Sequence, residues 1–131
     1  SGTSGMKATL NGVPQLSVLD GWWIEGYNGK NGWAVQGAEG PDRDARDAAA
    51  IYDLLEKDIV PLFYNVGEDG VSHGWMAVMK EAIKVTGPTF SARRMAKEYT
   101  DRFYRKALEA AMKADRGGER GSARGDMFGG I

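Results

Sequence analysis

The chain has 131 residues, a formal net charge of −1 and no cysteine. This length suits a single domain, and the balanced charge gives no reason to expect a nucleic-acid or anionic-membrane partner. Without cysteine there is neither a disulfide framework nor a thiolate metal site, as is typical of a cytoplasmic protein. The sequence contains no signal-peptide segment and no apolar run approaching about 18 residues. It therefore predicts a soluble protein.

Small residues lead directly into a short helix at the start of the chain. Residues 1–5 read Ser-Gly-Thr-Ser-Gly, and residues 6–10 read Met-Lys-Ala-Thr-Leu, a plausible helix. The first amides of a helix lack intrahelical acceptors, and the helix dipole favours negative charge there. Lys7 lies one turn into this helix, where its amine can neutralise an anion or form a Schiff base with an aldehyde. The segment therefore predicts a site for a phosphate-bearing ligand.

Two other interpretations of residues 1–12 compete with the phosphate site, a disordered terminus and a Walker A loop. Gly/Ser/Thr-rich starts also occur as disordered termini. The segment is not a Walker A loop, because the spacing Gly-x-x-x-x-Gly-Lys-Ser/Thr is not met.

Two short strands separated by a glycine loop follow. Residues 16–20, Leu-Ser-Val-Leu-Asp, predict a buried strand, and residues 33–36 predict a second one. Residues 21–32 contain glycine at positions 21, 26, 29 and 32, which indicates a loop between the strands. A glycine loop after a strand is typical of the carboxyl end of a sheet, where open α/β folds bind ligands.

The second half of the chain predicts three helices. The first starts near Asp42 as N-cap, runs over residues 45–57 and closes at Tyr64 after Pro61. The second is capped by Ser72, runs to Val85 and is stopped by Gly87-Pro88.

The third helix is the longest, from Phe90 to about Asp115. An apolar stripe at a spacing of four residues predicts its packing face. The stripe consists of Met95, Tyr99, Phe103, Ala107 and Ala111. From Arg116 the sequence loses its periodicity, so residues 116–131 predict a Gly-rich disordered tail.

A family resemblance covers most of the chain. Residues 1–12, Ser-Gly-Thr-Ser-Gly-Met-Lys-Ala-Thr-Leu-Asn-Gly, and residues 16–27, Leu-Ser-Val-Leu-Asp-Gly-Trp-Trp-Ile-Glu-Gly-Tyr, resemble the α-glucan (glycogen, starch, maltodextrin) phosphorylase family. The resemblance is to the shorter bacterial and archaeal branch. It extends to about residue 115 and is densest before Trp33. The longer enzymes usually read Gly-Thr-Gly-Asn-Met-Lys, where this chain has Ser4 and Gly5.

The resemblance implies a fold and a reaction. Residues 1–115 of this α/β chain would be the C-terminal portion of a phosphorylase catalytic domain, the Rossmann-like second domain of a GT-B glycosyltransferase-type fold. The reaction would be phosphorolysis, in which orthophosphate and a terminal α-1,4-glucosyl unit give glucose 1-phosphate. Its cofactor, pyridoxal 5'-phosphate, would be held by Lys7 as an internal aldimine, with the lysine as an anchor. The family's contacts to the cofactor phosphate map onto Thr3, Ser4 and Gly5, and its glucosyl contacts onto Ser1 and Gly2.

The resemblance also predicts an incomplete enzyme. Family members are several hundred residues long, and this chain begins inside their cofactor motif. We therefore expect a fragment, or one subunit of a split enzyme, that is inactive alone. Its partners would be α-1,4-glucan, orthophosphate, and the missing upstream part or a second copy. Two other functions stay open: a non-catalytic helical interaction module of phosphorylase ancestry, and a fragment of a related GT-B glucan synthase. The lysine motif argues against the synthase.

Four further residues have competing interpretations. His73 is the only histidine, and a surface or capping role is favoured over a general base because no nucleophile accompanies it. Trp22 and Trp23 are either core or interface residues, or a stacking platform for sugars. Glu25 has no second carboxylate at the spacing that a glycosidase pair requires.

Overall fold

The structure is a computed structural model that describes the backbone of residues 2–122 and the side chains of residues 2–116. It contains two compact units, one ending at Phe90 and the other beginning at Ser91. None of the described helices is both long and apolar enough to cross a membrane. Of the predicted fold class, the helix-rich α/β character is confirmed, with a small sheet.

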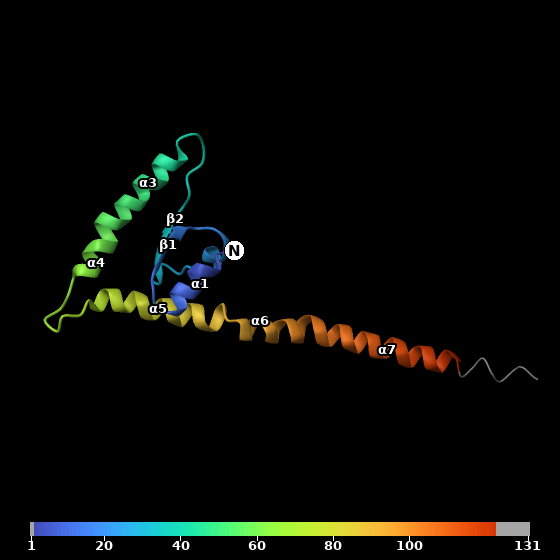
Figure 1. The fold of residues 1–131 in the computed structure, drawn as a ribbon. Helices are drawn as coiled ribbons and strands as arrows, with labels where there is room; N and C mark the ends of the chain where they lie inside the picture. The colour runs from blue at the N-terminus through green and yellow to red at the C-terminus, as the bar shows by residue number, and fades with distance from the viewer. Residues whose placement is uncertain (1, 123–131) are drawn as a thin grey trace, which may run out of the picture. The chain divides into compact units, whose positions relative to one another are not determined.

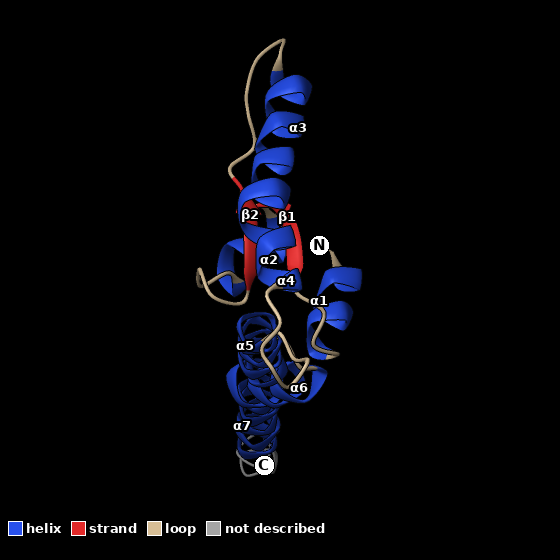
Figure 2. Cartoon of the chain, turned by 90° about the vertical axis from the view of Figure 1, so that its left-hand side faces the viewer, coloured by secondary structure: helices blue, strands red, loops and turns tan. Residues whose placement is uncertain are grey.

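The first unit opens with two helices that alternate with two strands. In chain order these are α1 (Thr3–Leu10), β1 (Gln15–Val18), α2 (Gly21–Gly26) and β2 (Gly32–Val35). The strands pair in parallel, with Gln15 opposite Gly32 and Val18 opposite Val35. Figure 2 shows this small sheet with α2 beside it. Both strands lie within one residue of their predicted starts.

The prediction of a continuous loop over residues 21–32 is wrong for its first half, because α2 occupies residues 21–26. Its sequence, Gly-Trp-Trp-Ile-Glu-Gly, carries glycine at both ends and has low helix propensity. Burial overrides that propensity, since Trp22 is 7% exposed and Trp23 1%. The indole nitrogen of Trp23 donates to the backbone oxygen of Trp33 at 3.2 Å, which ties α2 to β2.

One long helical run follows β2. It comprises α3 (Arg43–Leu54), a π-helical turn η1 (Leu55–Ile59) and α4 (Val60–Tyr64), and Figure 1 shows it as a single rod. Asp42 occupies the predicted N-cap position, although its side chain makes no capping hydrogen bond. The wide π turn lies just before Pro61, which lacks an N–H and would clash with the carbonyl of Lys57 in a regular α-helix.

The helix α5 (His73–Thr89) returns from a turn at residues 65–72. Its predicted cap is confirmed, because Ser72 Oγ accepts from the backbone N–H of Trp75 at 3.3 Å. The prediction that Gly87-Pro88 stops this helix is wrong, since the helix continues to Thr89. Tertiary contacts hold this last turn: Thr86 is fully buried, and the ring of Phe90 packs edge-on against Trp22 at 5.2 Å.

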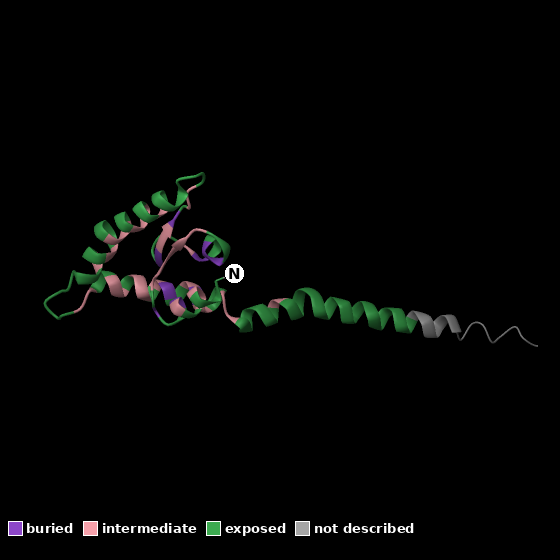
Figure 3. Ribbon diagram, turned by 45° about the horizontal axis from the view of Figure 1, so that its top comes forward, coloured by how far each residue is buried: buried purple, intermediate pink, exposed green. Residues whose placement is uncertain are grey.

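The core of the first unit is small. Its buried apolar residues are Trp22, Trp23, Val35 and Ala82. Figure 3 shows the buried residues gathered where α1, the strands and α5 meet. Three polar residues, Thr9, Asn31 and Thr86, are also fully buried.

The second unit is a continuous helical run, as predicted. It comprises α6 (Ala92–Tyr99), the π-helical turn η2 (Thr100–Tyr104) and α7 (Arg105–Ser122). Ser91 caps it by accepting from the backbone N–H of Arg94 at 3.3 Å. The helix α7 extends to Ser122, beyond Arg116, where the tail was predicted to start. Residues 123–131 of that predicted tail lie outside the described residues.

The predicted apolar stripe of the second unit is exposed. Met95 is 48% exposed, Tyr99 47% and Phe103 60%. Ion pairs at a spacing of four residues flank the stripe, including Arg94 with Glu98 at 2.8 Å. Such pairs support an isolated helix only weakly. The stripe is therefore an apolar face that the described residues of its own unit leave open.

Candidate functional site

The first turn of α1 has the geometry of an anion site. Gly2 precedes the helix in a left-handed conformation, with φ of 69°. Its carbonyl oxygen accepts from the N–H groups of Gly5 and Met6, at 3.0 and 3.4 Å. The earlier amides, those of Thr3 and Ser4, have no acceptor within the helix because no preceding turn exists. Together with the helix dipole, they make this turn favourable for a negatively charged group.

A cavity of about 450 Å³ adjoins this turn. Three elements enclose it: α1, the start of β1, and α2. Its wall includes Gly2, Ser4, Gly5, Gln15, Asp20 and Trp22. A phosphate bound at the first turn would therefore lie beside the hydroxyl of Ser4, the backbone amides and the indole of Trp22.

Two glycines let the indole of Trp22 close against α1. A Cβ atom placed on Gly2 would lie 3.0 Å from Trp22 Cδ1. One placed on Gly5 would lie 3.2 Å from Trp22 Nε1 and closer still to the side chain of Gln15. Both are closer than ordinary van der Waals contact. A side chain at Gly2 would therefore push the indole out of the cavity wall, and one at Gly5 would displace Gln15 as well as the indole. Both glycines are needed for close approach, and Gly2 is needed also for its left-handed conformation.

Two buried hydroxyl groups, on Thr9 and Thr86, anchor α1 to α5. Thr86 Oγ1, on α5, donates to Thr9 Oγ1 at 3.1 Å. Thr9 Oγ1 in turn lies 3.0 Å from the carbonyl oxygens of both Gly5 and Met6, to which it donates. Both threonines are 0% exposed. This chain of hydrogen bonds connects α5 to the turn of α1 that borders the cavity.

The chain was compared with known proteins. It is 57% identical over 109 residues to a glycogen phosphorylase of Aquifex aeolicus, a match that covers 82% of the chain and 16% of that protein. It is 51% identical over 121 residues to a maltodextrin phosphorylase of Thermococcus litoralis, covering 88% of the chain and 14% of that protein. It is 42% identical over 113 residues to a glycogen phosphorylase of Mycobacterium tuberculosis, covering 83% of the chain and 13% of that protein. Neither a family model nor a solved structure matches significantly.

The chain is homologous to part of the glycogen and maltodextrin phosphorylases. The resemblance read from the sequence is confirmed. The chain spans only 13% to 16% of the length of these three phosphorylases.

The predicted site residues of this phosphorylase segment fall into three groups. Gly2, Ser4 and Gly5 line the α1 cavity. Thr3 and Lys7 are exposed residues of α1 outside the cavity wall. Ser1 lies outside the described residues.

The position of Lys7 on α1 directs it toward the first turn. Residues three and four apart share a helix face, so Lys7 lies on the face of Thr3 and Ser4. Side chains on an α-helix lean toward its N-terminus, so we expect the lysine stem to lean over the preceding turn. The structure thus brings the amine's attachment point and the cavity-lining hydroxyl onto one face of one helix.

Gln15 is a site residue that was not predicted from the sequence. Its Oε1 atom is buried and has no hydrogen-bond partner among the described residues, although the side chain borders the α1 cavity. A buried acceptor without a partner is costly. A ligand hydroxyl or amide in the cavity would satisfy it. The available signal was a polar residue at the start of a strand, directly after Pro14.

The structure also places the other candidate residues, the two tryptophans of α2, His73 and Glu25. Trp22 and Trp23 are buried, which confirms the core interpretation. His73 is an exposed residue at the start of α5, and its Nε2 lies 2.8 Å from Asp69 Oδ2. Glu25 is exposed on α2.

We expect the Thr9–Thr86 pair to behave as one unit in a double-mutant cycle. Thr86→Val removes one hydrogen bond and should lower the free energy of unfolding by about 1 kcal/mol. Thr9→Val leaves the buried hydroxyl of Thr86 without an acceptor and should cost about 1–3 kcal/mol. The double variant should lose less than the sum, with a coupling of about 1 kcal/mol. Urea unfolding measures all three.

Thr100→Val is the matched control for that cycle, because the Thr100 hydroxyl is exposed and bonds only within its own helix, to Ala96 O at 2.8 Å. It should change the stability by less than about 0.5 kcal/mol. Additive losses at Thr9 and Thr86 would contradict the anchoring role.

Proposed function

We propose that this chain supplies the cofactor-holding helix of an α-1,4-glucan phosphorylase, a glycosyltransferase that releases glucose 1-phosphate from glucan chain ends with orthophosphate. One observation carries the proposal. In a chain 57% identical to a glycogen phosphorylase, α1 combines a first turn with free backbone amides, an adjoining cavity and a lysine one turn along the same helix.

The residues present fit pyridoxal 5'-phosphate. The free amides of the first turn and the hydroxyl of Ser4 suit a phosphate group. The cavity of about 450 Å³ is large enough for a small aromatic ring, and Trp22 gives it an aromatic wall. Gln15 Oε1 offers an acceptor to a ligand hydroxyl. When bound, the cofactor would supply a phosphate that exchanges a proton with the substrate phosphate.

The proposed roles of the protein groups are those that the resemblance to the phosphorylase motif implies. Lys7 anchors the cofactor covalently. Thr3, Ser4 and Gly5 hold its phosphate, and Gly2, with Ser1, contacts the glucosyl unit. The Thr9–Thr86 hydrogen bond keeps the first turn of α1 in position.

The proposal extends to the fold and the partners. Parallel sheets normally have several strands and are covered on both faces, whereas the described residues form only two strands. We infer that this sheet continues in a GT-B-type second domain of a larger cytoplasmic enzyme. The remaining part of that enzyme, or a second copy of this chain, would cover the strand edges. The substrates would be α-1,4-glucan and orthophosphate.

A second candidate, a non-catalytic interaction module, is supported by a different observation. The second unit consists of one helical run whose apolar stripe at Met95, Tyr99 and Phe103 is about half exposed. Such a face is typical of a helix that binds a partner. The lysine experiment below separates the two candidates.

Lys7→Ala should abolish covalent retention of pyridoxal phosphate in enzyme that contains this chain. Borohydride reduction followed by peptide mass spectrometry measures this directly, without reference to activity. The unsubstituted protein should carry the reduced cofactor on Lys7. Lys84→Ala is the control, since Lys84 is an exposed residue of α5 and should leave the labelling unchanged. Cofactor fixed at a different lysine would contradict the assignment.

The 131-residue chain alone should produce no measurable glucose 1-phosphate from glucan and orthophosphate, even with added pyridoxal phosphate. Positioning of the reactants and exclusion of water carry much of catalysis, and the chain spans at most 16% of the three phosphorylases described above. A coupled assay for glucose 1-phosphate tests this. Turnover by the pure chain would contradict it.

The purified chain should self-associate or bind the remainder of its enzyme. Covering the side chains of the apolar stripe would contribute roughly 1–2 kcal/mol each, a large amount for a protein of marginal stability. Light scattering at micromolar concentration gives the mass directly. Tyr99→Glu and Phe103→Glu should shift the chain toward monomer, whereas Arg93→Glu, elsewhere on α6, should not. A cooperatively melting monomer would contradict the prediction.

A further inference from the structure

We propose that the first unit holds a second carbohydrate site, which binds a stretch of glucan chain without reacting with it. The site is a cleft of about 550 Å³, called here the Trp33 cleft. It lies between β2, the loop that precedes it, and the η1–α4 part of the long helical run. Its wall includes Lys30, Trp33, Lys57, Asp58, Leu62 and Asn65. It shares no lining residue with the α1 cavity.

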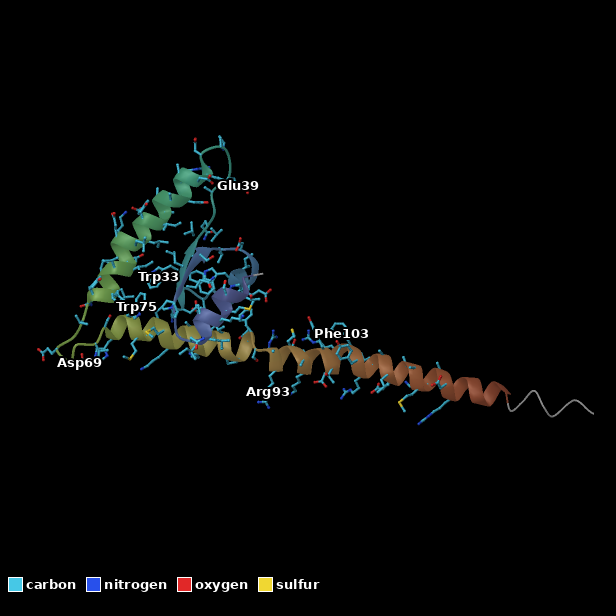
Figure 4. All side chains as sticks on the ribbon, viewed as in Figure 1. Trp33, Glu39, Asp69, Trp75, Arg93 and Phe103 are labelled. Carbon is cyan, nitrogen blue, oxygen red and sulfur yellow. The ribbon has the colours of Figure 1, made fainter. Side chains whose placement is uncertain are left out.

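The aromatic wall of the cleft is held rigidly. Trp33 sits in β2 opposite Leu16, and its backbone oxygen accepts from the indole of Trp23 at 3.2 Å. Its ring stacks on Trp75 of α5, with centroids 5.7 Å apart and planes 25° apart. Phe63 of α4 packs edge-on against Trp75 at 5.0 Å. Figure 4 shows Trp33 and Trp75 beside α4. An indole fixed in this way offers a preformed apolar surface to a ligand ring.

The loop that forms a second wall is also preorganised. The fully buried Asn31 donates to the carbonyl oxygen of Gly26 at 2.7 Å and accepts from the N–H of Asn28 at 3.0 Å. Asn28 in turn donates to Glu81 Oε1 on α5 at 2.9 Å. This bond, with one from Lys84, holds the pKa of Glu81 below its ordinary value. The loop therefore keeps Lys30 at the cleft with little ordering left to do on binding.

Polar side chains around the cleft point to an uncharged, hydroxyl-rich ligand. Asp58 and Asn65 are exposed on the rim, where a carboxylate and an amide offer acceptors and donors to hydroxyl groups. Lys57 is paired with Asp53 at 2.9 Å, and the hydrogen bond between them raises the pKa of Lys57. The charges of Lys30 and Lys57 are thus balanced by those of Asp53 and Asp58. A nucleotide or phosphate would need an excess of positive charge that this rim does not have.

An apolar wall with a few polar groups is the usual make-up of a small-ligand site, and pyranose rings present an apolar face together with hydroxyl groups. The π-helical turn that carries Lys57 and Asp58 is a kind of distortion frequent at functional sites. The choice of α-1,4-glucan among carbohydrates rests on the proposed function. A glucan held here would keep its other residues at high effective concentration near the enzyme.

The test uses the 131-residue chain labelled with nitrogen-15 and titrated with maltoheptaose. The chain has four tryptophans, and Trp33→Phe and Trp22→Phe identify their indole N–H signals. We expect the Trp33 signal to shift saturably while the Trp22 signal, from the α1 cavity, does not. Asp58→Ala and Asn65→Ala should each weaken binding about fivefold, the effect of one hydrogen bond. Both residues are exposed, so these variants should remain folded.

Control variants test whether the glucan binds at this cleft and nowhere else on the chain. Tyr52→Ala and Lys80→Ala change exposed residues that do not line the cleft and should leave the affinity unchanged. The Lys7→Ala chain should bind maltoheptaose as before, so failure of the cofactor proposal would not affect this result. The proposal is overturned if no saturable shift occurs, if both rim variants bind normally, or if adenosine monophosphate or orthophosphate binds the cleft in place of the glucan.

Discussion

The hydrogen bond between Thr86 and Thr9 is the contact on which the α1 site depends. It is fully buried, it joins residues 77 positions apart in the sequence, and it continues to the carbonyl groups of Gly5 and Met6. A short helix of eight residues is unstable by itself, so its orientation must come from packing. Buried hydroxyl pairs are costly unless satisfied, which favours a single arrangement of α1 on α5. The first turn of α1, and with it the candidate phosphate site, inherits that arrangement.

The small sheet limits how much of the chain can be buried. Two parallel strands of four residues each cannot form a large core, and the buried apolar residues of the first unit are chiefly the two tryptophans of α2 with Val35 and Ala82. The second unit adds an open apolar stripe. Both features suit a chain that is homologous to a small part of larger phosphorylases, because the groups left open here would be covered in a larger assembly. These uncovered strand edges and apolar side chains are the reason for proposing further strands and a partner surface.

Local signals in the sequence predicted most of the elements. Apolar and β-branched content predicted the first strand, and Ser72 was predicted as the cap of α5. Ser91 was not predicted as a cap, because the third helix was expected to start at Phe90. The predictions failed where tertiary packing overrode a local rule. Two glycines did not prevent α2, because Trp22 and Trp23 are buried there, and Gly87-Pro88 did not end α5, because Thr86 and Phe90 are held by α1 and Trp22. The site could be predicted only through its motif, whose residues Gly2, Ser4 and Gly5 line the cavity. A polar residue after Pro14 is too general a signal to identify Gln15, since its role arises from the packing of β1 against α1.

The α1 cavity and the Trp33 cleft are separate, yet the sheet connects them residue by residue. Gln15 lines the first and its register partner Gly32 lines the second. A Cβ atom on Gly32 would clash with the backbone oxygen of Gln15, so the strands can lie in register only with glycine at this position. Trp23 is a second link between the two sites. It borders the α1 cavity, and its indole N–H donates to the backbone oxygen of Trp33. A displacement of either strand would therefore alter both walls together. The rigidity that holds the proposed cofactor helix in place is thus the same rigidity that presents the indole of Trp33 to a ligand.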